Sequence, residues 1–390
     1  MIKTIRVMLV PNNKQQTRLF QYANTARFAY NWALGREKEN YKNGGKFISD
    51  GDLRKELTQL KKTDKYFWLN DISNNVTKQA IKDACNAYKR FFKGYSKFPK
   101  FKSRKSSIPS FYQDNVKIKF SATHVKVEGF TTSRKKNKQK INWIRLAEHN
   151  RIPTDCKYTN PRIKYDGLNW WLTVGVEYED STTLLSNNGI GIDLGIKDLA
   201  ICSDGNKYQN INKTQKVKKL EKQKRRLQRS ISRSYEKNKK GDSYCKTNNV
   251  IKKEKLLLKL NHRLTNIREN YLHQVTSEIV KREPNFIVLE DLNVSGMMKN
   301  RHLSKAIQQQ KLYEFRRQVE YKSNWRNILV IIANRYFPSS KLCNCCGKIK
   351  KDLKLSDRIY RCDCGNVIDR DEQASLNLKQ YGENVIKTVA

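Results

Sequence analysis

Apolar residues change their spacing along this 390-residue chain, and the changes mark out its elements. Residues 2–10, "IKTIRVMLV", alternate between apolar and polar positions, which predicts a strand. From Gln15 to about Lys42 the apolar residues recur at every third or fourth position, which predicts a helix with one buried face. They include Leu19, Tyr22, Ala26, Tyr30 and Ala33. Two further helices are predicted over residues 50–60 and 75–92.

A second pattern begins after the basic hinge "GYSKFPKFKSRKSS". The segments "VKIKFSATHVKVEGF", "KINWIRLAE" and "PRIKYDGLNWWLTVGVEYE" alternate like strands and are separated by polar turns. They predict a β domain over residues 107–182, to which the first strand, within residues 1–13, also belongs. Residues 14–106 are then a helical block inserted into this β domain.

A third pattern begins at Gly189, where "GIGIDLG" and "LAICSDG" predict a hairpin. Two long helices follow, each with an apolar stripe, and then a buried strand over residues 286–289. A last strand lies in "NILVIIANRYF", and the chain closes with a helix that carries Ala374, Leu376 and Leu378. We therefore predict an α/β domain over residues 183–338 that is completed by residues 367–390.

The charge of the chain is strongly unbalanced. Lys and Arg total 80 against 37 Asp and Glu, a formal net charge of +43. Such an excess repels itself in a compact fold unless a polyanion neutralises it, and nucleic acid is the obvious candidate. Residues 213–263 alone carry 19 Lys or Arg against 4 acids. This helical region is predicted to face phosphates, with Lys218, Lys219, Arg225 and Arg226 as contacts; a basic surface that merely keeps the protein soluble is the alternative.

Acidic residues stand at unusual places in the third domain. Asp193 lies inside the first apolar strand of this domain, and Glu290 lies at the end of the strand over residues 286–289. Buried strands do not tolerate a carboxylate without a partner. A single acid could pair with a lysine, but two on neighbouring strands form a hard-oxygen site suited to Mg²⁺ or Mn²⁺. With Asp369 or Asp371 at the closing helix, the arrangement predicts an RNase H-like nuclease, in which metals activate water for phosphodiester cleavage.

Five of the nine cysteines crowd between residues 343 and 364. Cys343 and Cys346 are spaced C-x2-C, and Cys362 and Cys364 are spaced C-x-C. Four thiolates from two such turns suit a structural Zn²⁺, so residues 339–366 are predicted to form a zinc ribbon inserted into the nuclease domain. Cys345 is predicted to be a bystander, with replacement of Cys346 as the alternative. The glycines directly after both pairs argue against a coincidence of cysteines.

The start of the chain has no apolar segment of signal-peptide length, and no later apolar run is long enough to span a bilayer. We therefore expect a cytoplasmic protein with no membrane partner, whose cysteines are thiols or metal ligands.

Several segments, taken in order, resemble one family. "GIDLGIKDLAICSDG", "FIVLEDLNVSGM", "SSKLCNCCG", "YRCDCG" and "DRDEQASLNL" look like the TnpB family of insertion-sequence proteins, compact relatives of the type V CRISPR effectors. The upstream segments "AYNWAL" and "SFYQ" also resemble the family, so the similarity covers essentially the whole chain. Each segment alone is a weak signal, whereas the ordered set is specific.

The resemblance implies an RNA-guided DNA endonuclease. It implies a RuvC-type site of Asp193, Glu290 and Asp371, with Asp371 preferred to Asp369 because of its place before the "QA" step. Gln373 stands where the family usually has Asn. The resemblance also implies that residues 14–106 are the recognition lobe and residues 107–182 a β-barrel-like wedge domain. The expected fold is thus multidomain α+β, with a RuvC nuclease domain interrupted by the zinc ribbon.

The implied partners are a guide RNA from the transposon right end and double-stranded target DNA beside a short adjacent motif. We expect a monomeric ribonucleoprotein, associated with the nucleoid of a prokaryote. Asn31, Phe111, Tyr112 and Gln113 are further candidate contacts, through base stacking or a base edge. The alternative for "SFYQ" is a strand with two core aromatic residues, and core packing is the preferred interpretation of Tyr30.

Two other functions remain open from the sequence. A transposase-type DNA strand transferase also uses RNase H-like acids, but it would bind transposon ends without RNA. An RNA-guided DNA-binding repressor would need no cleavage, although all three acids are present here.

Overall fold

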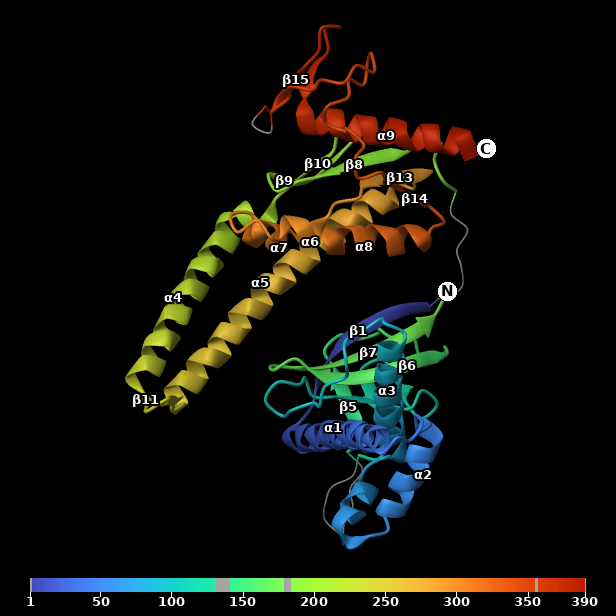
Figure 1. Ribbon diagram of the computed structural model, residues 1–390, viewed down its shortest axis with the longest axis vertical. Coiled ribbons are helices and arrows are strands. Elements are labelled where there is room, and N and C mark those ends of the chain that lie inside the picture. The colour runs from blue at the N-terminus through green and yellow to red at the C-terminus, as the bar shows by residue number, and fades with distance from the viewer. Residues whose placement is uncertain (1, 131–140, 179–183, 355–356, 390) are drawn as a thin grey trace. The chain divides into compact units, whose positions relative to one another are not determined.

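The computed structural model describes residues 2–130, 141–178, 184–354 and 357–389. The chain divides into two compact units, residues 1–179 and 180–390 (Figure 1). The predicted boundary after residue 182 falls within residues 179–183, outside the described part of the chain.

The first unit is built on a seven-stranded antiparallel sheet. Its strands stand in the order β2-β6-β7-β1-β5-β4-β3. Their bounds are β1 Ile2–Val10, β2 Ser110–Tyr112, β3 Lys119–Phe120, β4 His124–Lys126, β5 Trp143–Leu146, β6 Tyr158–Tyr165 and β7 Trp170–Glu177. The first strand pairs with β5 and β7 in the middle of this sheet. The helices that follow β1 are therefore inserted between two strands of one sheet, as the sequence predicted.

The helices of this unit have clear start signals. They are α1 Asn13–Lys42, α2 Asp50–Leu60, the 3-10 helix η1 Asp64–Asp71 and α3 Asn74–Phe92, which confirms the three predicted helices. The side chain of Asn12 accepts from the Gln15 amide while Gln15 bonds back to Asn12, a capping box that fixes the start of α1. The apolar face of α1 packs into one core with the sheet, and Tyr22 there is fully buried.

The second unit contains a five-stranded sheet in the order β10-β9-β8-β13-β14. The strand β9 runs antiparallel to both β10 and β8, whereas β13 runs parallel to both β8 and β14. Their bounds are β8 Ile190–Leu194, β9 Asp198–Cys202, β10 Lys207–Gln209, β13 Phe286–Glu290 and β14 Leu329–Ala333. The predicted hairpin is confirmed as β8 and β9; β10 was not predicted.

Helices cover both faces of this sheet (Figure 1). On one face lies α9, Arg370–Val389, and on the other lie α5, Asn248–Lys281, and α8, Leu312–Asn324. Alternate residues of β8, Ile190, Ile192 and Leu194, belong to the core that includes α5 and α8. The intervening positions of β8, including Asp193, therefore face α9.

The helix α9 lies unusually close to the sheet because glycines remove side chains from the contact. A Cβ on Gly191 would lie 2.1 Å from the Ser375 backbone oxygen and 2.4 Å from the Lys379 backbone nitrogen. On the helix side, a Cβ on Gly382 would lie 2.5 Å from side-chain carbons of Phe286 and Val288. These contacts fix the height of α9 above β8 and β13.

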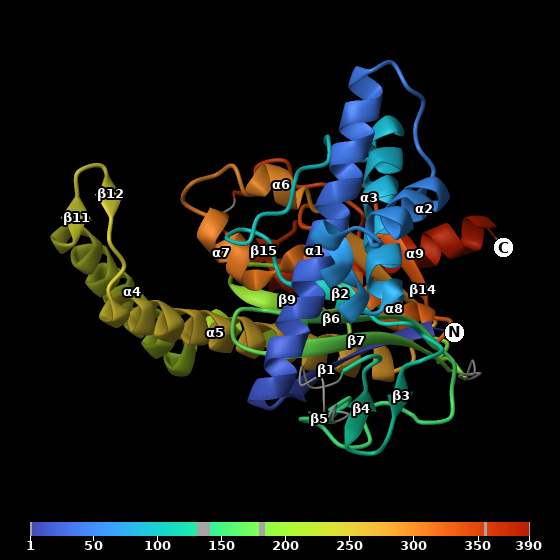
Figure 2. The ribbon, with the colours of Figure 1, turned by 90° about the horizontal axis from the view of Figure 1, so that it is seen from below.

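The two basic helices form a hairpin that extends from the sheet (Figures 1 and 2). The helix α4, Gln215–Lys237, packs against α5 through Val217, Leu220 and Leu264. Figure 2 shows two short strands at the tip of this hairpin, β11, Lys239–Lys240, and β12, Ser243–Tyr244. Shorter elements complete the unit: the 3-10 helix η2 Ile211–Lys213, α6 Val294–Met297, α7 Ser304–Gln310, β15 Ile359–Arg361 and β16 Val367–Asp369. None of the described helices is long and apolar enough to cross a membrane.

The close approach of α9 leads to a first prediction. The substitution Gly191→Ala should destabilise the second unit by about 1–3 kcal/mol, the usual cost of overpacking, because the new methyl group meets helix backbone that cannot rotate away. Amide hydrogen exchange in α9 measures the effect, and the variant should exchange faster there than the wild type. Gly35→Ala in α1 is the control, since its Cβ meets no atom within 4 Å. Unchanged exchange in α9 would show that the helix can move away from the sheet at little cost.

Candidate functional site

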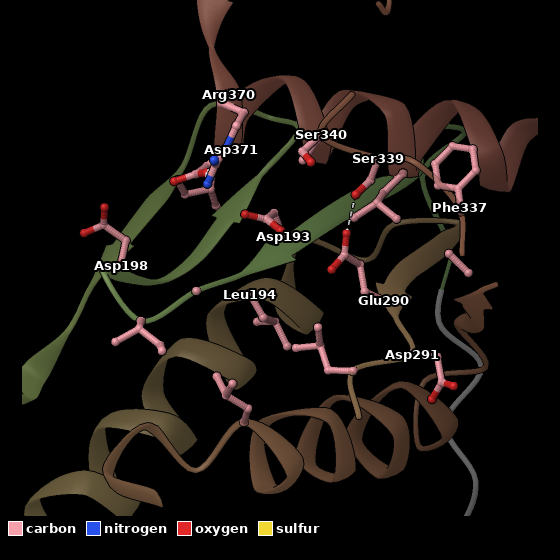
Figure 3. Close-up of a pocket in the computed structure, with 18 of the residues that line it drawn as sticks. Asp193, Leu194, Asp198, Glu290, Asp291, Phe337, Ser339, Ser340, Arg370 and Asp371 are labelled. Atoms are coloured by element: carbon pink, nitrogen blue, oxygen red, sulfur yellow. Dashed lines mark hydrogen bonds and ion pairs between the residues drawn. The ribbon is translucent and has the colours of Figure 1, made fainter. Parts of the chain in front are cut away.

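Five acidic side chains line one pocket on the α9 face of the second sheet, and three of them are the predicted residues Asp193, Glu290 and Asp371 (Figure 3). Asp193 is the fourth residue of β8, Glu290 the last of β13, and Asp371 the second of α9. The parallel register pairs Leu289 with Ile192, so its next step sets Glu290 beside Asp193. The helix then supplies Asp371 from above the same strands.

The pocket raises the pKa of two of these carboxyl groups. Burial is the main cause for Asp193, and the negative charges of Glu290 and Asp371 add to it. Burial also raises the pKa of Glu290, while the Ser339 hydroxyl, which donates to Glu290 Oε1 at 2.5 Å, opposes that rise. Among the described residues, no hydrogen bond or ion pair engages the Asp193 carboxylate. The site thus holds negative charge without a protein cation at its centre.

Asp371 is the carboxylate of the three that has cationic neighbours. The guanidinium of Arg370 lies 3.3 Å from Asp371 Oδ1, and that of Arg358 lies 3.9 Å from Asp371 Oδ2. Asp369 acts differently, because its Oδ1 accepts hydrogen bonds from the Asp371 and Glu372 amides at 2.9 and 3.3 Å. It therefore caps the first turn of α9 and does not line the pocket.

The donor set of this pocket fits a divalent cation. Three carboxylates offer hard oxygen ligands, and a bound cation would relieve the repulsion that raises the pKa of Asp193. The carboxylates are less tightly gathered than the cysteines: within the described ranges, only the four thiols place all their ligand atoms within 4.8 Å of one another.

The cysteine segment brings together Cys343, Cys346, Cys362 and Cys364. The Sγ atoms of Cys343 and Cys364 lie 3.6 Å apart, as do those of Cys346 and Cys362. Gly347 and Gly365 have φ of 71° and 91°, so glycine permits the tight turn after each pair. The spacing is suited to a zinc ribbon, and Cys345 stands outside the cluster with its thiol against Asn344.

Within the cluster, the electrostatics favour a thiolate at Cys343. The pKa values of Cys346 and Cys364 are raised instead: backbone hydrogen bonds lower them, but hydrogen bonds with the neighbouring thiols and burial outweigh that effect. Burial opposes ionisation of Cys343, but hydrogen bonds from the backbone amides of Cys346 and Cys345, and one from the Asn366 side chain, outweigh it. Together they lower the pKa of Cys343 to about 6. A thiolate at neutral pH is the form that binds a metal ion.

Two site features were not found from the sequence. Ser339 holds Glu290, and Arg335 lines the pocket beside Asp291, to which its guanidinium is hydrogen-bonded at 2.5 Å. Arg335 lies within the segment "NILVIIANRYF" that was predicted as the last strand, and Ser339 lies within "SSKLCNCCG", which was used only for the resemblance and the cysteines. The signal available was the pair of hydroxyls, "SS", directly before "KLC".

The structure revises three of the predicted nucleic-acid contacts. Phe111 is 2% exposed and packs against Tyr22, so its ring has no free face for a base. Gln113 is also 2% exposed, and burial removes its amide from any base edge. The side chain of Asn31 exchanges two hydrogen bonds with the Lys102 backbone, at 2.9 and 2.8 Å, and so anchors the basic hinge. The alternative of a strand with core aromatics is therefore correct for Phe111, as is core packing for Tyr30.

The other predicted contacts remain accessible. Tyr112 is partly exposed, and its hydroxyl donates to Asn115 Oδ1 at 3.3 Å. Lys218, Lys219, Arg225 and Arg226 are all exposed along α4. This helix can therefore present a row of positive charge to a polyanion, which is a prediction that the fold leaves open.

The raised pKa of Asp193 predicts that the negative charge of this side chain lowers the stability of the folded protein. A raised carboxyl pKa means that the folded state binds the proton more tightly than the unfolded chain, so ionised Asp193 destabilises the fold above that pKa. Asp193→Asn should raise Tm at about pH 8 in buffer without added Mg²⁺. The gain should shrink toward about pH 4, the ordinary range of aspartate.

Thermal unfolding across this pH range measures the effect, with Asp352→Asn, at an exposed position, as the matched charge control. A pH-independent gain, or a loss at every pH, would contradict the assignment of strain to the Asp193 charge.

The cysteine geometry predicts which thiols hold metal. Cys346→Ser should lose bound zinc and unfold the segment around it, because one of four ligands is gone. Cys345→Ser should keep a full complement of zinc, since that thiol lies outside the cluster. Elemental analysis of the purified proteins measures both, and equal zinc loss in the two variants would show that the exposed thiol takes part.

Comparisons with known proteins agree with this architecture. Residues 173–301 match the IS605 OrfB family model described as "Probable transposase". Residues 1–46 match the companion model described as "Helix-turn-helix domain". Residues 313–378 match the model described as "Cas12f1-like, TNB domain". Residues 2–46 form one strand and one helix here, so the second description does not fit their structure.

Two curated relatives match nearly the full chain. "Putative RNA-guided DNA endonuclease InsQ" of Escherichia coli (strain K12) is 29% identical over 99% of this chain and 93% of its own length. A "Putative RNA-guided DNA endonuclease" of Streptomyces pristinaespiralis is 29% identical over 97% of this chain and 89% of its own length.

A solved structure shows the same fold. The protein in a cryo-EM structure of a Cas12f1–sgRNA–target DNA complex covers 97% of this chain with 98% of its own, at a TM-score of 0.63 and 12% identity. The chain is thus similar to IS605 OrfB proteins in the matched segments, and to proteins named as putative RNA-guided DNA endonucleases over nearly its full length.

Proposed function

We propose that this chain is an RNA-guided DNA endonuclease with a RuvC-like site. The observation that carries the proposal is the pocket in which Asp193, Glu290 and Asp371 meet from two adjacent strands and one helix. The strand order β10-β9-β8-β13-β14, with its antiparallel and parallel halves, has the pattern of an RNase H-like sheet. Three acids gathered on one face of such a sheet are suited to metal-dependent phosphodiester cleavage.

Asp193, Glu290 and Asp371 would hold Mg²⁺ or Mn²⁺. When bound, such an ion supplies an activated water and stabilises the leaving oxygen of the cleaved phosphodiester. The protein itself orients the carboxylates and admits the phosphate. Arg370 and Arg358, which contact Asp371 and line the same pocket, would attract a phosphate oxygen of the substrate.

The rest of the chain supports a polyanionic partner. The exposed Lys and Arg residues of α4 form a surface suited to the backbone of a nucleic-acid duplex, in which protein contacts position and base pairing specifies. By family resemblance, residues 14–106 serve as the recognition lobe and residues 107–182 as the wedge domain. Residues 339–366 serve as a structural zinc ribbon, and the particle is a monomeric ribonucleoprotein.

The test begins with the protein co-expressed with RNA transcribed across the right end of its own transposon. The purified particle is incubated with a plasmid library that carries a guide-matched target beside randomised flanking sequence. We expect Mg²⁺-dependent cleavage of plasmids with one flanking motif, and Asp193→Ala should lower the cleavage rate by at least about 10³-fold, since a transition-state charge partner is lost.

The alternatives give different results. RNA co-purification and tight target binding without cleavage would favour a guided repressor. A protein without bound RNA that binds only transposon ends would contradict the proposal and favour a strand transferase.

A further inference from the structure

Ser339 lies between β14 and the cysteine segment and is buried, with 7% of its surface exposed. Its hydroxyl donates to Glu290 Oε1 at 2.5 Å, as Figure 3 shows. In the part of the chain that the structure describes, this is the one hydrogen bond made to the Glu290 carboxylate. This hydrogen bond restrains Oε1 of Glu290, and Oε2 is left to bind a ligand in the pocket.

Ser339 is itself fixed by the helix that carries Asp371. The Asn377 amide donates to the Ser339 backbone oxygen at 2.6 Å and to the Leu342 backbone oxygen at 2.7 Å. One turn earlier, Gln373 donates to the same Leu342 oxygen at 2.5 Å. Both amide side chains are completely buried. The loop that bears Ser339 is thus bound to α9 by directed bonds and not by apolar packing alone.

The same group of amides reaches the cysteine cluster. Asn366 donates to Gln373 Oε1 at 3.2 Å, and its Nδ2 also lies 3.5 Å from Cys343 Sγ. Buried amides cost free energy unless their hydrogen bonds are made, and here the amide nitrogens are bonded, whereas Asn377 Oδ1 has no hydrogen-bond partner among the described residues. The bonds that are made restrict the relative positions of the groups they join. Together, these hydrogen bonds hold the segment 339–343 in one position on α9.

From these contacts we propose that Ser339 is a positioning residue. Its hydroxyl, held on α9 through Asn377, orients the Glu290 carboxylate to bind a divalent cation. The same cation is shared with Asp193 and Asp371. The inference rests on the proposed nuclease function for its cation. Partners that orient a metal ligand typically account for about 10- to 100-fold in metal affinity. The loss of this hydroxyl should therefore weaken the cation site while leaving the α9 contacts in place.

The test compares Ser339→Val with Ser339→Thr, which have the same shape and differ in the hydroxyl. Mn²⁺ binding to the full-length protein is measured by titration calorimetry, with Asp193→Ala defining binding elsewhere on the protein. We expect Ser339→Val to bind Mn²⁺ about 10-fold more weakly than Ser339→Thr. In the guide-RNA particle, the Mn²⁺ concentration for half-maximal cleavage should rise by the same factor, and the rate at saturating Mn²⁺ should recover.

Ser340→Ala is the matched control, because the neighbouring serine makes no hydrogen bond to Glu290 among the residues described. Zinc content should equal that of the wild type in every variant, and Ser339→Ala replaces the valine if added bulk disturbs folding. Equal Mn²⁺ affinity in the valine and threonine variants would overturn the inference while wild-type cleavage still stood. Failure of the wild type to cleave, with the difference in affinity intact, would instead count against the nuclease function alone.

Discussion

The contact between α9 and the strands β8 and β13 is the constraint on which the second unit depends. Gly191 and Gly382 bring helix and sheet backbone close, and no larger side chain fits at either position without displacing its neighbours. This distance decides whether Asp371, at the start of the helix, reaches the carboxylates of Asp193 and Glu290. The site is therefore set by main-chain packing, and its chemistry follows from where the glycines allow the helix to lie.

Charge is the second constraint, because the chain as a whole is strongly basic whereas the pocket is acidic. A chain with net charge +43 contains a pocket in which burial raises the pKa of Asp193, and the negative charges of Glu290 and Asp371 add to that rise. The basic excess is exposed on α4, where water solvates it, whereas the acids are held together by the fold at a cost in stability. Such an arrangement is favourable only with ligands of both signs: a polyanion for the surface and a small cation for the pocket.

The position of two carboxylates in apolar strands was sufficient to predict much of the site from the sequence, because a buried carboxylate needs a partner. The structure then places Ile190, Ile192 and Leu194 in the core on one face of β8, so that Asp193 faces the other. Periodicity could not locate Ser339, because a single hydroxyl after a strand has no repeat to mark it. Periodicity also gave the wrong prediction for Phe111, because a three-residue edge strand is too short to show which of its aromatic side chains faces a core. It gave the wrong prediction for Asn31 because the hinge that this side chain anchors is distant in sequence.

The position of the cysteine segment in the chain follows from the same geometry. It leaves the five-stranded sheet after β14 and ends at β16, directly before α9, so both of its ends lie next to site residues. A flexible connection there would leave the start of α9, and with it Asp371, free to fray, since terminal turns lack hydrogen-bond partners. Anchoring the segment to α9 through Gln373 and Asn377 restricts that freedom, and the four gathered thiols bring its two turns together. The cysteine segment is thus best understood as part of the structure that holds the acidic pocket together.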